Sequence, residues 1–342
     1  MLDLISRIPV CLAPMAGYTD QAMRKVFRNF GRGLFYTEVA VAQGLIRNSA
    51  PSWHLLACDA DEGPVAGHIY GSDPAVMAAA AHMLEETGRF CAIDINCGCP
   101  VRKIVAKGAG AALIRSPAQI GAIVKAVRGS VRLPVMVKTR IGYDSGKVQI
   151  FEILRRVEDA GADAIAIHGR FADQHHKGAA DWDMIAAVKQ QATIPVIGNG
   201  GIKTAGQAIS LLRASGVDAV MVARGAVGNP WILHDAECLL RGEAVPLRTY
   251  ADLREIIHLH LDALVALKEK EKKWRRRKID TDRAAALQFR CHLIQYLAGL
   301  EHWADIRRQF SCISSCAQIH SMVDVVVSRQ TRPWDALYPL RG

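Results

Sequence analysis

Several features that would place a chain outside the ordinary globular class are missing from these 342 residues. No uninterrupted apolar run is long enough to span a membrane, so we expect no transmembrane helix and no membrane partner. Residues 1–7 lack the apolar stretch and cleavage site of a secretory signal. The nine cysteines are odd in number and scattered, which favours reduced thiols in the cytoplasm over a disulfide framework.

Two further patterns are absent. Cys97 and Cys99 form a Cys-x-Cys pair without the two-residue spacing or the second ligand pair of a zinc site, and Cys312 and Cys316 lie one helical turn apart. We therefore predict no metal or iron–sulfur centre. No Gly-x-Gly-x-x-Gly opens the first helix, which disfavours a doubly wound dinucleotide-binding sheet.

Positive charge, in contrast, is in excess. The formal net charge is +10 and the pI is about 9.3. A basic protein of this kind is suited to an anionic partner, of which nucleic acid is the commonest. A basic surface kept for solubility is the alternative, and charge alone does not separate the two.

A repeated unit organises the first two-thirds of the chain. Each unit is a short apolar run, then a polar or glycine-rich loop, then a stretch with apolar residues at helical spacing. Runs this short and rich in Val and Ile are typical of buried parallel strands. Eight such units over about 230 residues predict an α/β fold, a (β/α)₈ TIM barrel. The runs cover residues 8–13, 34–39, 65–70, 91–95, 134–137, 162–167, 194–197 and 219–222, and helices are expected at 21–30, 74–87, 118–127, 146–160, 183–190 and 205–214.

Strand patterns stop near residue 250. Helices are expected at 251–268, 281–298, 303–310 and 317–327, and residues 231–248 are interpreted as the junction. The sequence thus predicts a catalytic barrel over 1–240, an all-α helical domain over 249–330 and a tail over 331–342. Between the first two helices of that domain lies KEKEKKWRRRK. This run indicates either a solvated helix end or a phosphate-binding patch.

Polar or glycine residues follow the apolar runs, at the strand ends where this fold places its active sites. Glycines after the seventh and eighth runs let backbone N–H groups approach a ligand, which predicts a phosphorylated ligand or cofactor. The ammonium of Lys138 could stabilise a negatively charged ring. Cys99, on a turn between Gly98 and Pro100, could transfer a proton. The candidates are Pro14, Met15, Ala16, His68, Asn96, Cys99, Lys138, Arg140, His168, Asn199, Gly200, Gly201, Arg224 and Gly225.

Several segments together resemble the tRNA-dihydrouridine synthases, from about residue 8 to residue 327. The motif most specific to that family is Asn-x-Gly-Cys-Pro followed downstream by Lys-Gly-x-Gly. The matching segments are APMAGYTD (13–20), DINCGCPVRKIVAKGAGAALI (94–114), VKTRIG (137–142), HGR…Q…KGAADW (168–182), GNGGI (198–202), ARGAVGNPW (223–231) and FRCHLIQYLAGL (289–300).

The resemblance implies an FMN-bound barrel reduced by NADPH, which passes hydride to C6 of a uracil base in tRNA. It implies that Cys99 protonates C5, that Asn96 and Arg140 contact the substrate, and that Lys138 and His168 contact the flavin. The cofactor-binding set becomes Pro14, Met15, Ala16, His68, Lys138, His168, Asn199, Gly200, Gly201, Ala223, Arg224 and Gly225. RNA contacts are expected from Arg102, Lys103, Lys272, Lys273, Trp274, Arg275, Arg276 and Arg277. The expected partner is tRNA, with rRNA as the alternative, and the protein is expected to be a monomer.

The sequence departs from the family pattern at three positions. His68 stands where the family usually has a flavin-contacting glutamine, Ala172 where a basic residue is common, and Ala223 where a glycine precedes Arg224. Two other functions remain open at this point. One is an FMN-dependent small-molecule pyrimidine oxidoreductase of the dihydroorotate dehydrogenase kind, which would not need the basic helical domain. The other is a non-catalytic RNA-binding barrel, which would not need Cys99 and Lys138.

Overall fold

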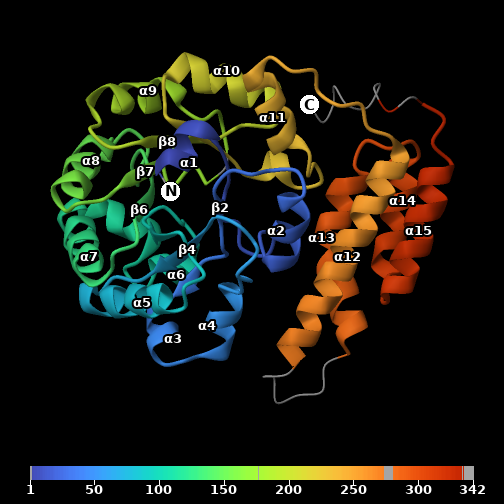
Figure 1. Cartoon of the computed structure of the whole chain (residues 1–342), viewed down its shortest axis with the longest axis horizontal. Coiled ribbons are helices and arrows are strands. Elements are labelled where there is room, and N and C mark those ends of the chain that lie inside the picture. Colours follow the sequence, from blue (N-terminus) through green and yellow to red (C-terminus); the bar gives the residue numbers. More distant parts are fainter. Residues whose placement is uncertain (1, 176, 273–279, 333, 335–342) are drawn as a thin grey trace.

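The computed structural model describes residues 2–175, 177–272, 280–332 and 334, and it contains a barrel joined to a bundle of helices (Figure 1). The strands are parallel and run in the order β1-β9-β8-β7-β6-β5-β4-β2, with β3 paired to β4. The Leu12 N–H donates to the Leu34 carbonyl at 3.1 Å and so brings β1 against β2. The predicted (β/α)₈ barrel is confirmed. The strands are β1 (Val10–Leu12), β2 (Phe35–Tyr36), β3 (Ala40–Val41), β4 (Val65–Tyr70), β5 (Ala92–Asn96), β6 (Val135–Arg140), β7 (Ala164–His168), β8 (Val196–Asn199) and β9 (Ala219–Val222).

Helices cover the outside of the barrel, as the repeated pattern predicts. They are α1 (Leu2–Arg7), α2 (Gln21–Arg28), α3 (Ala42–Ile46), α4 (Ala50–Leu55), α5 (Pro74–Glu86), α6 (Arg102–Val105), α7 (Pro117–Ser130), α8 (Ile150–Asp159), α9 (Trp182–Gln191), α10 (Ala205–Ser215) and α11 (Ile232–Arg241), with 3₁₀ turns η1 (Gly110–Arg115) and η2 (Arg224–Ala226). The helix expected from residue 146 begins only at Ile150, because the preceding residues form a loop whose Ser145 hydrogen-bonds Asp173.

The junction between the two domains is shorter than the sequence indicated. The segment 231–248 contains α11, which packs against β1 and completes the outer ring of the barrel. The helical domain begins at Tyr250 and comprises α12 (Tyr250–Lys272), α13 (Thr281–Leu297), α14 (Trp303–Gln309), the turn η3 (Phe310–Cys312) and α15 (Cys316–Ser328). Within the expected tail, Trp334 is buried edge-on against Trp231 and Tyr250.

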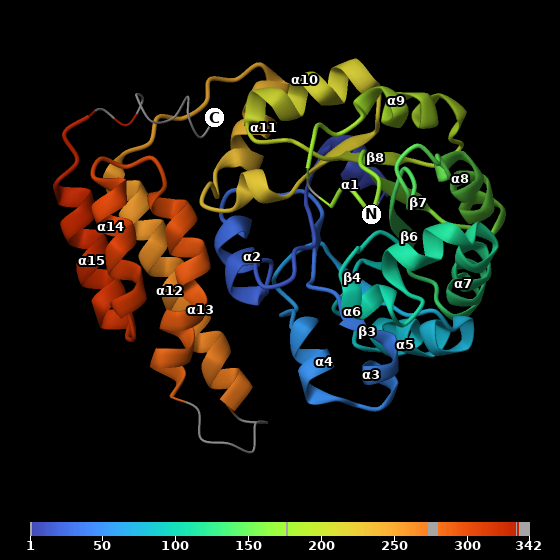
Figure 2. The same cartoon turned by 180° about the vertical axis from the view of Figure 1, so that it is seen from behind.

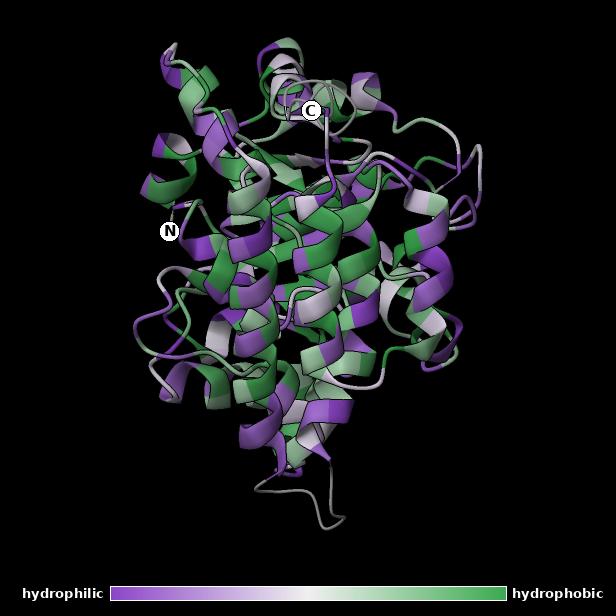
Figure 3. Ribbon diagram, turned by 90° about the vertical axis from the view of Figure 1, so that its right-hand side faces the viewer, coloured by the Kyte–Doolittle hydropathy of each residue, from purple (hydrophilic) through white to green (hydrophobic). Residues whose placement is uncertain are grey.

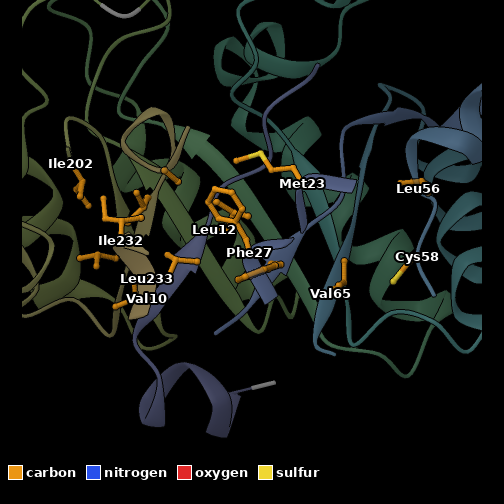
Figure 4. Close-up of a cluster of buried hydrophobic side chains, with 14 of the residues drawn as sticks. Val10, Leu12, Met23, Phe27, Leu56, Cys58, Val65, Ile202, Ile232 and Leu233 are labelled. Atoms are coloured by element: carbon orange, nitrogen blue, oxygen red, sulfur yellow. The ribbon is translucent and has the colours of Figure 1, made fainter. Parts of the chain in front are cut away.

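The barrel has two apolar layers because side chains alternate between the faces of each strand. Most inward positions are small or aliphatic, such as Ala66, Ala92 and Met136, while Tyr36 of β2 and Ile5 of α1 complete this inner cluster. Outward positions pack against the helices in a larger cluster that continues into the helical domain. Figure 4 shows part of this outer layer, where Leu12 lies near Phe27 of α2. Beyond the last inner apolar position, the same inward face carries polar side chains at the strand ends.

The helical domain rests on the barrel through α2, which lies between the barrel and the pair α12 and α13 in both views (Figures 1 and 2). Gln288 of α13 donates to the Asp20 carboxylate, the N-cap of α2, at 2.9 Å. The Tyr18 ring meets the His292 ring edge-on, with centroids 5.3 Å apart. Figure 3 shows hydrophobic and hydrophilic residues interspersed along the bundle helices, whose buried positions include Leu253 and Leu261 of α12 and Phe289 of α13. These contacts hold the bundle beside the barrel mouth.

No helix in the described part of the chain is both long enough and apolar enough to cross a bilayer.

Two buried histidines in the bundle predict a stability that falls in acid. Burial lowers the pKa of His292 to about 4 and the pKa of His260 well below its usual value of 6.5, and their ring centroids are 4.5 Å apart. Among the described residues, neither Nε2 atom has a hydrogen-bond partner. The unfolded chain therefore binds protons that the folded chain rejects, so stability is lost as the pH falls below about 6.5.

We expect the free energy of unfolding, measured with urea, to drop by about 2–3 kcal/mol between pH 7.5 and pH 5.5 through these two groups. His292→Leu should make the acid decline shallower, because one of the two proton-binding groups is gone from the unfolded chain. His82→Leu is the matched control, since His82 is exposed on α5. An equal change in both variants would refute the buried pair as the cause.

Candidate active site

A cleft of about 1450 Å³ opens at the C-terminal ends of the barrel strands and extends to the end of α13. The predicted site residues in the barrel, with one exception, line this cleft. The exception is Lys103, which is exposed on α6 beside it. The residues brought together are Pro14, Met15, Ala16, His68, Asn96, Cys99, Arg102, Lys138, Arg140, His168, Asn199, Gly200, Gly201, Ala223, Arg224 and Gly225.

The charge of the cleft is of one sign. Among the described residues, no Asp or Glu lines it, whereas several Lys and Arg side chains do. Cations placed together without carboxylates repel one another, so the arrangement favours an anionic ligand. The lining cations are Arg102, Lys138, Arg140, Arg170, Lys203 and Arg224.

The loops after β8 and β9 form a narrow cradle at one end of the cleft. Gly200 has φ +134°, and a Cβ there would lie 2.7 Å from the Ala180 Cβ. A Cβ on Gly225 would lie 2.5 Å from the Ile202 carbonyl oxygen. Bare backbone is therefore required where these loops meet, which leaves N–H groups accessible to an anion.

Two guanidinium groups stand beside this cradle. Burial and the nearby Arg224 lower the pKa of Arg170, which shows that the two cations influence each other. Arg170 donates from Nη1 to His168 Nε2 at 3.2 Å and from Nη2 to the Gly178 carbonyl at 2.8 Å. Its Nε also donates to the Gly178 carbonyl at 3.1 Å, so all three nitrogens of Arg170 make bonds within the protein. Arg170 would therefore favour a phosphate through its charge, while the donors would come from Arg224 and the loop N–H groups.

Lys138 extends from β6 into the middle of the cleft. Its Nζ donates to Asn199 Oδ1 at 3.3 Å, and the Asn199 amide donates to the Met221 carbonyl at 2.7 Å. Burial, with the neighbouring Arg140 adding to it, lowers the pKa of Lys138 to about 8. No carboxylate forms an ion pair with Lys138 among the described contacts. An anionic ring or group bound here would favour the charged form of the amine and raise that pKa again.

Cys99 is presented by a turn that follows β5. The Asn96 Oδ1 accepts from the N–H groups of Gly98 at 3.1 Å and Cys99 at 3.0 Å, and the Cys99 carbonyl accepts from Ala111 N at 2.9 Å. Cys99 is half-buried and lines the cleft. Cys97 is fully buried, and burial raises the pKa of its thiol far above the usual value. Of these two thiols, only that of Cys99 can reach a ligand.

Arg140 lines the cleft, but much of its guanidinium is used within the protein. Nε donates to the Gly98 carbonyl at 2.8 Å, and Nη1 donates to the carbonyls of Phe171 and His175 at 3.1 and 3.0 Å. These bonds tie the cysteine turn to the loop after β7. The expected contact with substrate therefore stays a prediction, and the observed role is to hold two loops together.

Sequence reasoning did not single out Arg170 or Trp182 as site residues. The Trp182 Nε1–H donates to the Gly200 carbonyl at 2.9 Å, and its ring covers Gly198, where a Cβ would lie 2.4 Å from Cζ3. Both residues belong to the conspicuous segment HGR…KGAADW, which was the available signal. Arg170 and Trp182 reach the site only because the loop after β7 folds back over β8, which the sequence did not show.

The predicted RNA contacts in the helical domain fall largely outside the described residues. Lys272 is the last residue of α12 and is half exposed, and its Nζ lies 3.8 Å from Glu269 Oε2. Lys273, Trp274, Arg275, Arg276 and Arg277 are not among the residues that the structure describes. Nor does any group of three or more His, Cys, Asp or Glu in the described ranges form a candidate metal site.

Comparison with known proteins agrees with this geometry. The model of the family "Dihydrouridine synthase (Dus)" matches residues 11–327. A "Probable tRNA-dihydrouridine synthase 1" from Synechocystis sp. is 35% identical over 329 residues, covering 96% of this chain and 88% of the relative. A "Probable tRNA-dihydrouridine synthase" from Mycobacterium tuberculosis is 34% identical over 328 residues, covering 92% and 81%. "tRNA-dihydrouridine synthase B" from Pseudomonas aeruginosa is 37% identical over 254 residues, covering 74% and 76%.

Among solved structures, histamine dehydrogenase from Rhizobium sp. 4-9 is similar with a TM-score of 0.51 and 12% identity. The match covers 94% of this chain and 63% of that one. At this identity the similarity concerns the fold alone, and it agrees with the barrel described above.

Proposed function

This chain belongs to the dihydrouridine synthase family, and we propose that it reduces the C5–C6 double bond of uridine in tRNA, with FMN as cofactor and NADPH as reductant. The observation that carries the proposal is the cleft itself. It combines a glycine cradle with neighbouring guanidinium groups, a half-buried lysine that forms no ion pair with a carboxylate of the described residues, and a thiol on a turn held by Asn96. A small-molecule pyrimidine oxidoreductase would not need a helical domain beside the barrel mouth.

The residues of the cleft suit FMN. The cradle of Gly200, Gly201 and Gly225, with Arg224 and Arg170, would hold the phosphate. Lys138 and His168 would face the flavin ring system, and Asn199 accepts a hydrogen bond from Lys138. The loop after β1 would flank the ring with Pro14, Met15 and Ala16. Ala223 directly precedes Arg224 at the phosphate end of the cleft. Bound FMN, once reduced by NADPH, supplies the hydride for C6 of the base.

The protein supplies the proton for C5. We assign that role to Cys99, because its thiol is the one that lines the cleft, on a turn held by Asn96. Hydride at C6 and a proton at C5 together add two hydrogens across the double bond, and the Cys99 thiolate regains its proton from solvent. The Asn96 side chain also lines the cleft, where it would help to orient the base.

The base must leave its stack to enter this cleft, so the protein must hold the RNA around it by the backbone. Arg102 and Lys103 on α6 lie beside Cys99 and suit that task, as does the basic run from Lys272 to Arg277. The proposal also places the protein in a reducing compartment such as the cytoplasm, since its nine cysteines are free thiols.

The purified protein should be yellow and should release FMN on denaturation. The physical reason is the positive cleft, whose described lining holds several cations and no Asp or Glu. The measurement is the absorption spectrum, followed by chromatography of the released cofactor and addition of NADPH without oxygen, which should bleach the colour. A colourless protein that cannot be reconstituted with FMN would refute the assignment of the cofactor.

A further inference from the structure

A chain of hydrogen bonds connects the interior of the barrel with the turn that carries Cys99. His68 Nδ1 lies 2.5 Å from Asp94 Oδ2, and His68 Nε2 lies 2.9 Å from Asn96 Nδ2. Asn96 Oδ1 accepts from the N–H groups of Gly98 and Cys99. His68 and Asp94 are register partners on β4 and β5, and Asn96 follows two residues later on the same face. The sheet register therefore builds the chain of contacts.

The donors and acceptors in this chain fit together in one way. Main-chain N–H groups only donate, so Asn96 must face them with Oδ1 and face His68 with Nδ2. An amide nitrogen donates, so His68 Nε2 must accept and carries no proton. The remaining imidazole proton is on Nδ1 and is donated to the Asp94 carboxylate. Asp94 thus fixes the tautomer of His68, and His68 fixes the orientation of the Asn96 amide.

The network is enclosed. His68 is 2% exposed and Asp94 is fully buried. Asp94 Oδ1 has no hydrogen-bond partner among the described residues, so the contact with His68 is the side-chain bond that compensates this buried carboxylate. A buried, half-satisfied carboxylate costs stability. A requirement for the Nδ1-protonated tautomer of His68 would explain why Asp94 is buried at this position, next to the imidazole.

We propose that His68 is a positioning residue, which locks the Asn96 amide and, through it, the turn that presents Cys99. The inference rests on the proposed function for its consequence in catalysis, but the restraint on the thiol is a property of the protein alone. It differs from the expectation that His68 takes the place of a flavin-contacting glutamine, because both ring nitrogens are already engaged by Asp94 and Asn96. The two interpretations predict different defects when His68 is replaced.

The first test measures the reactivity of the Cys99 thiol in the FMN-loaded protein. His68→Leu removes the acceptor for the Asn96 amide, so the turn should open more often and iodoacetamide should modify Cys99 about tenfold faster. Peptide mass spectrometry reports each cysteine separately. Modification of the exposed Cys312 should be unchanged, which excludes general unfolding. Tyr36→Leu is the control for altered packing, because it removes the ring that stands edge-on to His68, with centroids 6.5 Å apart, and leaves both hydrogen bonds of His68 in place.

Conservative variants separate a restraint from a loss of packing. His68→Gln keeps one donor for Asp94 and one acceptor for Asn96, so Cys99 reactivity should return to within about threefold of the wild type. Asp94→Asn no longer dictates the tautomer and should increase the reactivity, and it also serves if His68→Leu does not fold. In an Asn96→Ala background, His68→Leu should add nothing further, because His68 acts through Asn96.

The second test measures cofactor binding and turnover. In His68→Leu the affinity for FMN and the flavin absorption spectrum should stay unchanged, while kcat for uridine reduction falls about tenfold with little change in KM. A shifted flavin spectrum and weaker FMN binding with unchanged Cys99 reactivity would overturn the inference and make His68 a direct flavin contact. If the wild type formed no dihydrouridine, the proposed function would fail, whereas the thiol measurement would still decide the restraint.

Discussion

Cys99→Ala should lower the rate of uridine reduction by about 10²–10⁴-fold, which is the usual loss when general acid catalysis is removed. The reason is that carbon C5 must receive a proton, and among the described residues no other thiol lines the cleft. The variant should still bind FMN and still oxidise NADPH, because the phosphate cradle and Lys138 are untouched. Single-turnover conversion of unmodified tRNA, with dihydrouridine measured by mass spectrometry, gives the rate.

Cys97→Ala is the matched control for that experiment. Its thiol lies two residues away but is fully buried, so it cannot reach a ligand in the cleft. Turnover should therefore remain within a few-fold of the wild type, and stability should decline slightly through the lost packing of one sulfur atom. Normal turnover by Cys99→Ala would place the proton donor elsewhere in the cleft.

Neutralising the five cations Lys272, Lys273, Arg275, Arg276 and Arg277 should weaken tRNA binding by about 10²–10³-fold near physiological salt. Each phosphate contact that is lost removes about 0.7–0.9 from the slope of log affinity against log salt concentration, because fewer counterions are released. The run connects α12, which packs against α2, with α13, whose Gln288 donates to the Asp20 carboxylate at the N-cap of α2. Binding should be measured at several salt concentrations with unmodified tRNA.

The matched control neutralises five exposed cations on the outer helices and the opposite end of the barrel, namely Arg89, Lys125, Arg132, Arg155 and Arg213. This variant changes the net charge equally but should leave the slope close to that of the wild type. FMN content should be normal in both variants, because both leave every described cation of the cleft unchanged. Equal slopes in the two variants would show that the basic run makes no specific contact with RNA.

The sequence predicted the barrel because buried parallel strands leave a strong pattern: short apolar runs at regular intervals. It also predicted which residues share the cleft, since strand ends of a barrel meet on one face. Short elements were missed. The expected strand at 34–39 contains only β2, which pairs with Val65 and Ala66 of β4. The separate strand β3 pairs with Ile69 and Tyr70 of β4, and α3 and α4 follow directly. Helices and strands this short are stabilised by tertiary packing, and they are too short to show a periodic pattern of apolar residues in the sequence.

The hydrogen-bond partners of the site could not be read from the sequence. That Asp94 lies beneath His68 depends on the register of β4 against β5, and that Arg140 binds three carbonyls depends on how two loops fold over the barrel. Sequence spacing placed these side chains on one face but did not show which atoms they use. For this reason Arg140 and His68 have observed contacts within the protein, which their residue types alone did not indicate.

The most direct measurement is the conversion of uridine in tRNA by the purified protein. A tRNA transcript that lacks modifications is incubated with the FMN-loaded protein and NADPH, then digested and analysed by mass spectrometry. The account predicts dihydrouridine, recognised by the gain of two hydrogens, in wild-type reactions and its near absence with Cys99→Ala. Unchanged tRNA together with reduction of a free pyrimidine would contradict it and would favour a small-molecule oxidoreductase.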